Sequence, residues 1–205
     1  MPLSERGQGP ARTYHWLVQK VARIITEVLS PTVLVTGFLL LTGWLAAGGR
    51  GLLFGLVAAV FTAIGPFAGI LLATRRGKLS DHHVSQREQR LPVLLSSVAS
   101  AALGFAVLLA LGAPATATVG LVAVASGMVI VGAVNAFWKL SVHMAVAVFV
   151  STAVASAHGP TWLPAVFAAG VIGWSRIQLG DHTPAQVVAA VPAGLAVTAG
   201  YALMA

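Results

Sequence analysis

Residues 92–137 read PVLLSSVASAALGFAVLLALGAPATATVGLVAVASGMVIVGAVNAF, a segment without a single lysine, arginine, aspartate or glutamate. A helix needs about 20 apolar residues to cross the hydrocarbon core of a bilayer, so this segment is long enough for two crossings. Gly112, Ala113 and Pro114 interrupt it near its middle and favour a break in the helix there. The segment therefore predicts two consecutive membrane helices.

The composition of the whole chain agrees with that interpretation. Of its 205 residues, 58% are hydrophobic and only 8% are charged, and the mean hydropathy is +0.90. In soluble domains roughly a quarter of the residues are charged. We therefore expect an all-α fold, a polytopic bundle of transmembrane helices. The absence of cysteine excludes disulfides, thiolate catalysis and cysteine metal sites.

The apolar stretches predict six to seven spans, of which the fifth and sixth are short for a full crossing. These stretches are residues 31–47, 52–74, 92–111, 115–137, 144–157, 162–174 and 183–203. Residues 14–29 form an amphipathic pattern that fits either a helix lying in the membrane interface or an extension of the first span. The chain thus divides into a cytoplasmic or interfacial segment, residues 1–30, and one membrane domain, residues 31–205.

The charges predict an orientation. If the spans alternate, eleven of the twelve lysines and arginines lie on one side of the membrane and only Arg50 lies on the other. The positive-inside rule makes the crowded side cytoplasmic, and we expect a multi-pass protein of the cell membrane. The net charge of +7 does not indicate a nucleic-acid partner, because the basic residues sit between apolar spans and form no surface interleaved with aromatic residues.

Polar residues gather in three segments on that one side: residues 75–92, 139–143 and 175–186. The second and third segments open or close membrane helices, so their side chains are expected to meet at the level of the lipid headgroups. Arginine binds phosphoryl oxygens through paired hydrogen bonds, and Arg87, Arg90 and Arg176 are available for that role. Histidine can act as nucleophile or acid near neutral pH, as His143 and His182 could. No metal site and no cofactor are expected.

These segments resemble the motifs of the type 2 phosphatidic acid phosphatase superfamily, which are Lys-x6-Arg-Pro, Pro-Ser-Gly-His and Ser-Arg-x5-His-x3-Asp. The third motif is matched from Ser175-Arg176 to His182, with Gln186 in place of the aspartate. The second is matched at Ser141 and His143 only. The first is represented by residues 87–92, REQRLP, with His83 where the family has lysine. Residues 182–187, HTPAQV, are similar to the His-Thr-x-x-Gln-Val pattern of dolichyl diphosphate phosphatases.

The resemblance implies a role for each matched residue. His182 would be the nucleophile that forms a phosphohistidine, His143 would be the general acid, and Gln186 would orient His182. Phosphate would be bound by Arg87, Arg90, Lys139, Ser141, Ser175 and Arg176. Residues 31–205 would then be a lipid phosphatase-like membrane domain.

The expected function is a metal-independent membrane lipid phosphatase, whose partners are the bilayer and a lipid phosphate substrate. That substrate would be a polyprenyl phosphate or diphosphate, or a phosphatidate-like lipid. The alternatives are a catalytically weak or inactive protein that binds or transports such lipids, and a phosphotransferase with another acceptor. The sequence leaves the individual lipid and the oligomeric state open.

Overall fold

The computed structural model describes residues 10–80, 84, 86–162 and 164–205, and within these ranges every regular element is a helix. The expected all-α fold is confirmed. Four helical stretches are long and apolar enough to cross a membrane: Pro31–Arg75, Glu88–Ala110, Ala115–Phe137 and Pro184–Met204. Val142–His158 is apolar but shorter. These lengths do not by themselves confirm six to seven spans.

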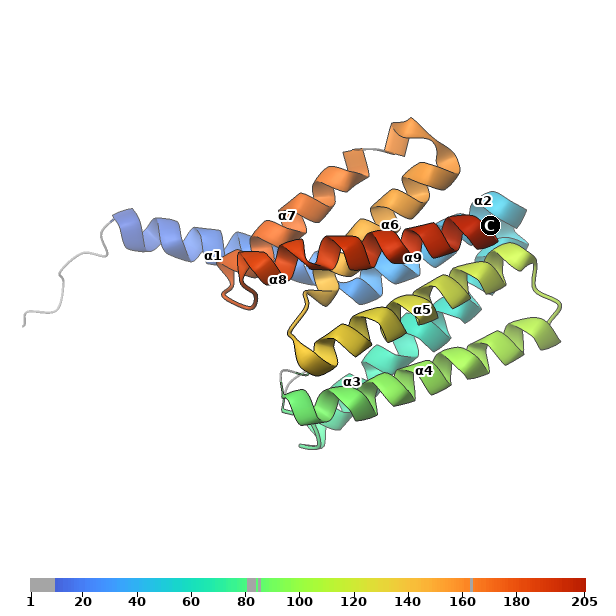
Figure 1. Ribbon diagram of the computed structural model, residues 1–205, viewed down its shortest axis with the longest axis horizontal. Coiled ribbons are helices and arrows are strands. Elements are labelled where there is room, and N and C mark those ends of the chain that lie inside the picture. The colour runs from blue at the N-terminus through green and yellow to red at the C-terminus, as the bar shows by residue number, and fades with distance from the viewer. Residues whose placement is uncertain (1–9, 81–83, 85, 163) are drawn as a thin grey trace, which may run out of the picture.

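In chain order the elements are α1 (Pro10–Val28), α2 (Pro31–Ala59), the π-helical turn η1 (Val60–Ile64), α3 (Gly65–Arg75), α4 (Arg87–Ala110), α5 (Ala115–Phe137), α6 (Val142–His158), the 3-10 turn η2 (Pro160–Trp162), α7 (Pro164–Gln178), α8 (Pro184–Val188) and α9 (Ala190–Met204). From α4 onward the longer helices run back and forth along the bundle (Figure 1). The break predicted at Gly112-Ala113-Pro114 lies between α4 and α5.

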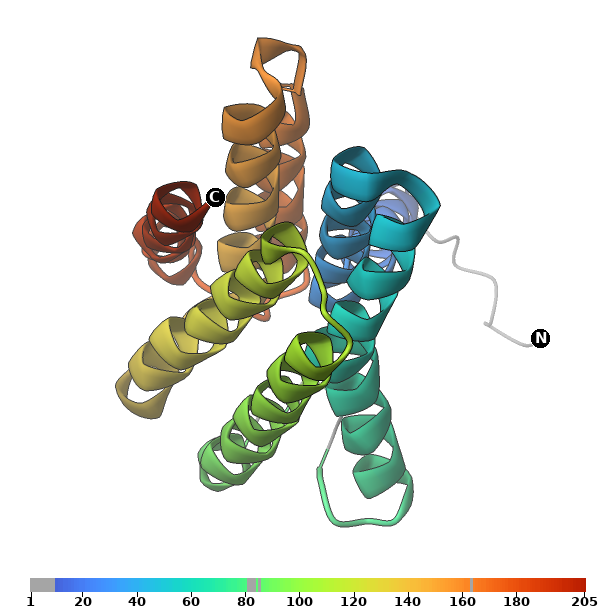
Figure 2. The same ribbon diagram turned by 90° about the vertical axis from the view of Figure 1, so that its right-hand side faces the viewer.

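Helix α2 reverses its direction inside its own length. Ala47 (φ −151°, ψ 29°) and Gly48 (φ 53°, ψ −138°) leave the helical conformation, and the positive φ of Gly48 is one that glycine adopts without strain. The two arms then run side by side, as Figure 2 shows at the top of the blue and cyan helices. Gly43 on the first arm and Gly51 on the second touch through their backbones. Small residues permit this close approach, as they do in pairs of membrane helices.

The glycine contact gives a test of the hairpin. A Cβ atom on Gly51 would overlap the carbonyl oxygen of Gly43, whereas a Cβ atom on Gly37, in the first arm, meets nothing within 4 Å. We expect Gly51→Ala to lower the free energy of unfolding by about 1–3 kcal/mol, the usual cost of overpacking. Gly37→Ala should not lower it, because alanine favours a helix over glycine and its Cβ atom is accommodated there. The unfolding of the two purified variants in detergent, measured side by side, checks this. Equal stability would contradict the hairpin packing.

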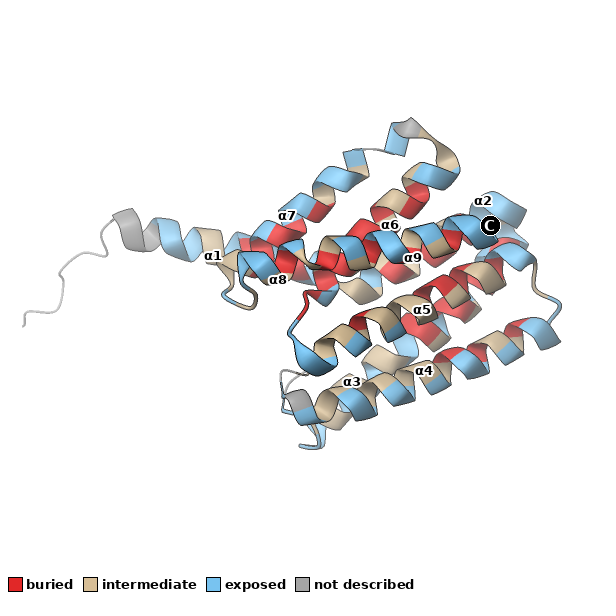
Figure 3. Cartoon of the chain, viewed as in Figure 1, coloured by how far each residue is buried: buried red, intermediate tan, exposed pale blue. Residues whose placement is uncertain are grey.

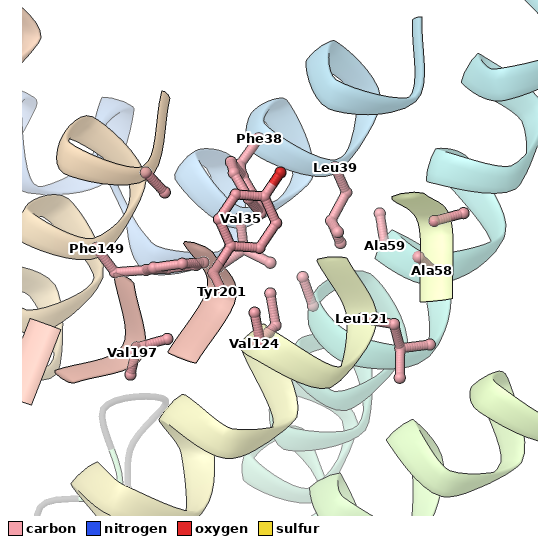
Figure 4. Packing of buried hydrophobic residues seen from close by; sticks show 14 of the residues in the cluster. Val35, Phe38, Leu39, Ala58, Ala59, Leu121, Val124, Phe149, Val197 and Tyr201 are labelled. Atoms are coloured by element: carbon pink, nitrogen blue, oxygen red, sulfur yellow. The ribbon is translucent and has the colours of Figure 1, made fainter. Parts of the chain in front are cut away.

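An aromatic cluster joins three of the helices at the centre of the bundle (Figure 4). The ring of Phe38 (α2) lies edge-on to those of Phe149 (α6) and Tyr201 (α9), with centroid distances of 5.0 and 5.4 Å. Leu121 and Val124 of α5 belong to the same buried cluster. In Figure 3 the buried residues line the inner faces of the helices, while outward faces are exposed. Large exposed apolar residues such as Phe167 and Leu203 suit a surface that faces lipid.

This packing brings six helix ends to one end of the bundle. The carboxyl ends of α3, α5 and α7 and the amino ends of α4, α6 and α8 all lie on the left in Figure 1. The described residues of the three polar segments are located at these ends. Residues far apart in the chain are thereby placed around one region.

Candidate functional site

A pocket of about 840 Å³ is lined by residues at this end and by residues deeper in the bundle. Charged and histidine side chains from several elements line it: Glu27, Glu88, Arg90, Lys139, His143, Arg176, Asp181 and His182. Its remaining lining is mostly apolar and comes from α2 to α6 and α9. The pocket therefore combines an ionisable end with an apolar interior.

Arg176 is the most deeply buried charge in the described part of the pocket, with only 3% of its surface exposed. Its Nη2 atom pairs with Oδ2 of Asp181 at 3.0 Å, and the negative charge of Glu27 also acts on the guanidinium. Nε and Nη1 are buried without a hydrogen-bond partner. Leaving donors of a buried charged group unpaired is costly, so this guanidinium is suited to binding an anion from the pocket.

The turn after α7 carries His182 back toward Arg176. Gly180 takes a positive φ of 72°, and the backbone N–H groups of Asp181 and His182 donate to the carbonyl oxygen of Arg176 at 3.2 and 3.3 Å. The next helix, α8, begins with a capping box in which Thr183 and Gln186 satisfy each other's backbone N–H groups. The sequence from Arg176 to Gln186 thus forms one compact unit.

Gln186 also holds the imidazole of His182. Its Oε1 atom lies 3.3 Å from Nδ1 of His182 and accepts a hydrogen bond from the backbone N–H of Thr183 at 3.1 Å. When the imidazole carries its proton on Nδ1, that N–H donates to Gln186 and the lone pair of Nε2 is left for other chemistry. Gln186, which the resemblance implied would orient His182, therefore contacts its imidazole directly.

The electrostatic surroundings keep His182 uncharged. Burial, followed by the positive charges of Lys139 and Arg176, lowers the pKa of His182 to about 4, against the opposing effects of Gln186 and Asp181. At neutral pH the imidazole is therefore neutral. A neutral imidazole has the lone pair that a nucleophile needs.

The second polar segment joins the third at the pocket. Lys139 donates from Nζ to the backbone oxygen of Asp181 at 2.8 Å, and His143 in the first turn of α6 is buried and lines the pocket. Ser141 is the N-cap of α6: its hydroxyl accepts from the backbone N–H of Met144 at 3.4 Å. Its own backbone N–H donates to the carbonyl oxygen of Gln186 at 3.4 Å. Ser141 thus links α6 to α8; it was expected to bind phosphate, but it is fully buried and is not among the residues that line the pocket.

The first polar segment contributes Arg90. Its Nε and Nη1 atoms donate to the backbone oxygens of Val84 and Asn135, at 3.4 and 3.2 Å, and the side chain lines the pocket. Arg87 begins α4, but its side chain lies outside the described residues, as does His83. The structure therefore brings Arg90, Lys139, His143, Arg176 and His182 to one pocket.

Ser175, expected to bind phosphate, is placed elsewhere. Its hydroxyl is fully buried, donates to the carbonyl oxygen of Ile172 at 2.8 Å and lies 3.0 Å from the hydroxyl of Thr26. It does not line the pocket. Ser175 instead joins α7 to α1, and it supports Arg176 only through the backbone.

Sequence reasoning missed several residues near the site, including Glu27, Glu88, Asn135 and Asp181. Asp181 pairs with Arg176, Glu27 lines the pocket from α1, and Asn135 lines it from α5. Asn135 also accepts the backbone N–H of Leu140 at 3.0 Å through Oδ1, which shapes the turn before Ser141. The position of Asn135, a polar residue at the end of an apolar span, was a signal for this role. Glu27 offered no such signal, because only the packing of α1 on α7 brings it here.

The chain was also compared with known proteins. No family model, no curated protein and no solved structure matches it.

Proposed function

We propose that the protein is a metal-independent membrane phosphatase that hydrolyses a polyprenyl phosphate or diphosphate, or a phosphatidate-like lipid, through a phosphohistidine. One observation carries the proposal. Arg176, whose guanidinium has two buried donors without a partner, lines the same pocket as the neutral imidazole of His182. Phosphate is an anion that arginine binds well, and the nearby imidazole supplies the nucleophile.

The proposed reaction uses two steps. Nε2 of His182 attacks phosphorus, a P–N bond forms, and the P–O bond to the lipid breaks. Protonated His143 gives its proton to the departing oxygen. Water then attacks the phosphohistidine and returns a proton to His143, which releases inorganic phosphate and regenerates His182. Arg176, with Lys139 and the arginines of the first segment, stabilises the charge on the transferring group.

The apolar part of the pocket supports a lipid substrate. It follows α5 from Asn135 to Ala123, which is about 18 Å at the rise of an α-helix. An aliphatic tail that lies in this space would leave its phosphate at the ionisable end. Pockets that bury most of a ligand in this way select for its apolar part as well as for its polar group.

Gly127 offers a test of the tail pocket. It lines the pocket on α5, and a Cβ atom there would make only ordinary contact with Val197, at 3.4 Å. Gly127→Leu is expected to lower turnover of a long-chain lipid phosphate by roughly tenfold or more, because its outer carbons enter the space of the tail. Gly127→Ala is the matched control and should be nearly unaffected. Steady-state rates with a long-chain lipid and with a short water-soluble ester distinguish a blocked tail pocket from a general loss of activity. An equal loss on both substrates would argue against a tail pocket here.

The topology proposed with this function has seven spans. The reversal at Ala47-Gly48 divides Pro31–Arg75 into two antiparallel arms, and α4, α5, α6, α7 and α8–α9 supply the remaining crossings. An even number of crossings then separates the three polar segments. The excess of basic residues at that end supports a cytoplasmic site in the cell membrane.

The charge of Lys139 predicts a pH effect. Only neutral His182 is nucleophilic, so kcat/KM should fall as the pH drops through its pKa of about 4. Lys139 is one of the positive charges that lower this pKa. Lys139→Gln should therefore raise the pKa of His182, and kcat/KM should begin to fall at a higher pH. Lys78 is an exposed cation outside the pocket, so Lys78→Gln should not change the pH at which kcat/KM falls. The pH profiles of kcat/KM for the unsubstituted protein and the two variants check this. An unchanged profile in Lys139→Gln would count against His182 as the titrating group.

Phosphate release from a panel of lipid phosphates, with a chelator present, tests the proposal. The purified protein is expected to turn over at least one member of the panel. A second candidate, a lipid-binding or transport protein without turnover, is favoured by one contact: Asp181 already occupies Nη2 of Arg176. Saturable binding without phosphate release would select that candidate and remove the phosphatase. Labelled product on an acceptor other than water would indicate a phosphotransferase.

A further inference from the structure

Helix α1 (Pro10–Val28) carries an apolar stripe that no other described part of the chain covers. Tyr14, Leu17, Val21, Ile24 and Val28 recur at intervals of three and four residues, so they share one face of the helix. Each is between 47% and 71% exposed. A contiguous exposed apolar face of this kind marks an interaction surface.

A different face of α1 is fixed to the protein. Ala22 and Thr26 are buried, the hydroxyl of Thr26 lies 3.0 Å from that of Ser175, and Nε2 of Gln19 donates to the carbonyl oxygen of Gln178 at 2.6 Å. These contacts hold α1 on the end of α7, so the stripe is not the side with which α1 packs on the bundle. Its partner must come from outside the described chain.

The remaining side of α1 carries exposed cations. Lys20 and Arg23 are both exposed, and the ammonium of Lys20 lies 5.0 Å from the centroid of the Trp16 ring. An apolar stripe flanked by basic residues and tryptophan is typical of helices that lie in the headgroup region of an anionic bilayer. Helix α1 also ends at Val28, just before the apolar stretch that begins at Pro31.

A second copy of the chain fits the stripe less well. Spacing of three and four is also that of a coiled-coil seam, but Tyr14 to Val28 spans only two heptads. Three to four heptads are the usual requirement for a coiled coil. A pair of helices of so short a length has only marginal stability. A bilayer surface, in contrast, lies immediately beside a helix that precedes a membrane span.

We propose that the exposed stripe of α1 binds the surface of an anionic bilayer, with Lys20 and Arg23 directed to the lipid phosphates. Through Gln19 and Thr26 this anchored helix holds the end of α7 that carries Ser175 and Arg176. The proposal does not depend on the reaction proposed above. It concerns where α1 lies, not what the pocket does.

The absence of cysteine from the chain permits a direct test with single-cysteine variants. Leu17→Cys and Ile24→Cys report on the stripe, and Arg23→Cys reports on the basic side. Each full-length protein is placed in nanodiscs of anionic phospholipid that hold one copy, where both membrane faces are reachable. A membrane-impermeant maleimide is expected to react at positions 17 and 24 roughly tenfold or more slowly than at position 23. Nitroxide labels at 17 and 24 should relax with oxygen and not with an aqueous nickel reagent.

Two outcomes would overturn the proposal. Equal, fast reaction at all three positions would mean that the stripe stands in water. Protection at positions 17 and 24 that is found only in discs holding two copies would assign the stripe to a second chain. Thermal unfolding of each variant beside the unsubstituted protein ensures that altered reactivity does not come from a lost fold.

Discussion

Replacement of Arg176 by glutamine is expected to lower phosphate release from a lipid phosphate by roughly a thousandfold. The guanidinium is buried, and Nε and Nη1 have no partner within the described protein. In the proposed function these donors bind the phosphoryl oxygens and stabilise the charge that develops during transfer. Glutamine keeps a polar side chain but lacks the charge and the fork of donors.

The neighbouring carboxylate provides the matched control for Arg176. Asp181→Asn removes the ion pair at 3.0 Å but keeps the guanidinium, so this variant should retain activity within about tenfold. Phosphate release and thermal unfolding are measured for both variants. Full activity in a folded Arg176→Gln protein would remove Arg176 from the mechanism.

Replacement of His182 by alanine is expected to have the largest effect, a loss of roughly ten thousandfold or more, because the nucleophile itself is absent. The fold should survive, since the side chain is only partly buried and its hydrogen bond is to Gln186. The control is His158→Ala. His158 ends α6 at the opposite end from His143 and does not line the pocket.

Single-turnover rates with a long-chain lipid phosphate check the prediction for the two histidines. Loss of activity in His182→Ala together with full activity in His158→Ala supports a specific role for His182. Similar rates in the two variants would contradict that role. A parallel loss of thermal stability in His182→Ala would point to a structural effect. Covalent trapping in the unsubstituted protein then tests the role of His182 independently of that variant.

The helices and their ends were largely predictable from the sequence. Long apolar stretches without charge can satisfy their backbone groups in a membrane only as helices, so residues 92–137 alone predicted α4 and α5. The break expected between residues 47 and 52 is the reversal at Ala47-Gly48. The expected alternation of spans predicted that the three polar segments gather at one end. In the structure Arg90, His143 and His182, one from each segment, line one pocket.

The details of the site were less predictable, because they depend on packing between distant elements. The motif indicates Ser175 as a phosphate ligand, but α1 packs against it and its hydroxyl is hydrogen-bonded to the hydroxyl of Thr26. Nothing in the motif indicated that contact. The pairing of Asp181 with Arg176 depends likewise on the turn at Gly180. An amphipathic pattern identified α1 as a helix, but it did not show that Glu27 would reach the pocket.

The most direct test of the central claim is to trap the covalent intermediate. The protein is mixed with a long-chain lipid carrying labelled phosphate, quenched within milliseconds under alkaline conditions, digested and mapped by mass spectrometry. The account predicts label on the peptide that contains His182, stable in alkali and lost in acid, and its absence from Arg176→Gln. Label on another residue, or release of free phosphate without any labelled protein, would contradict the account.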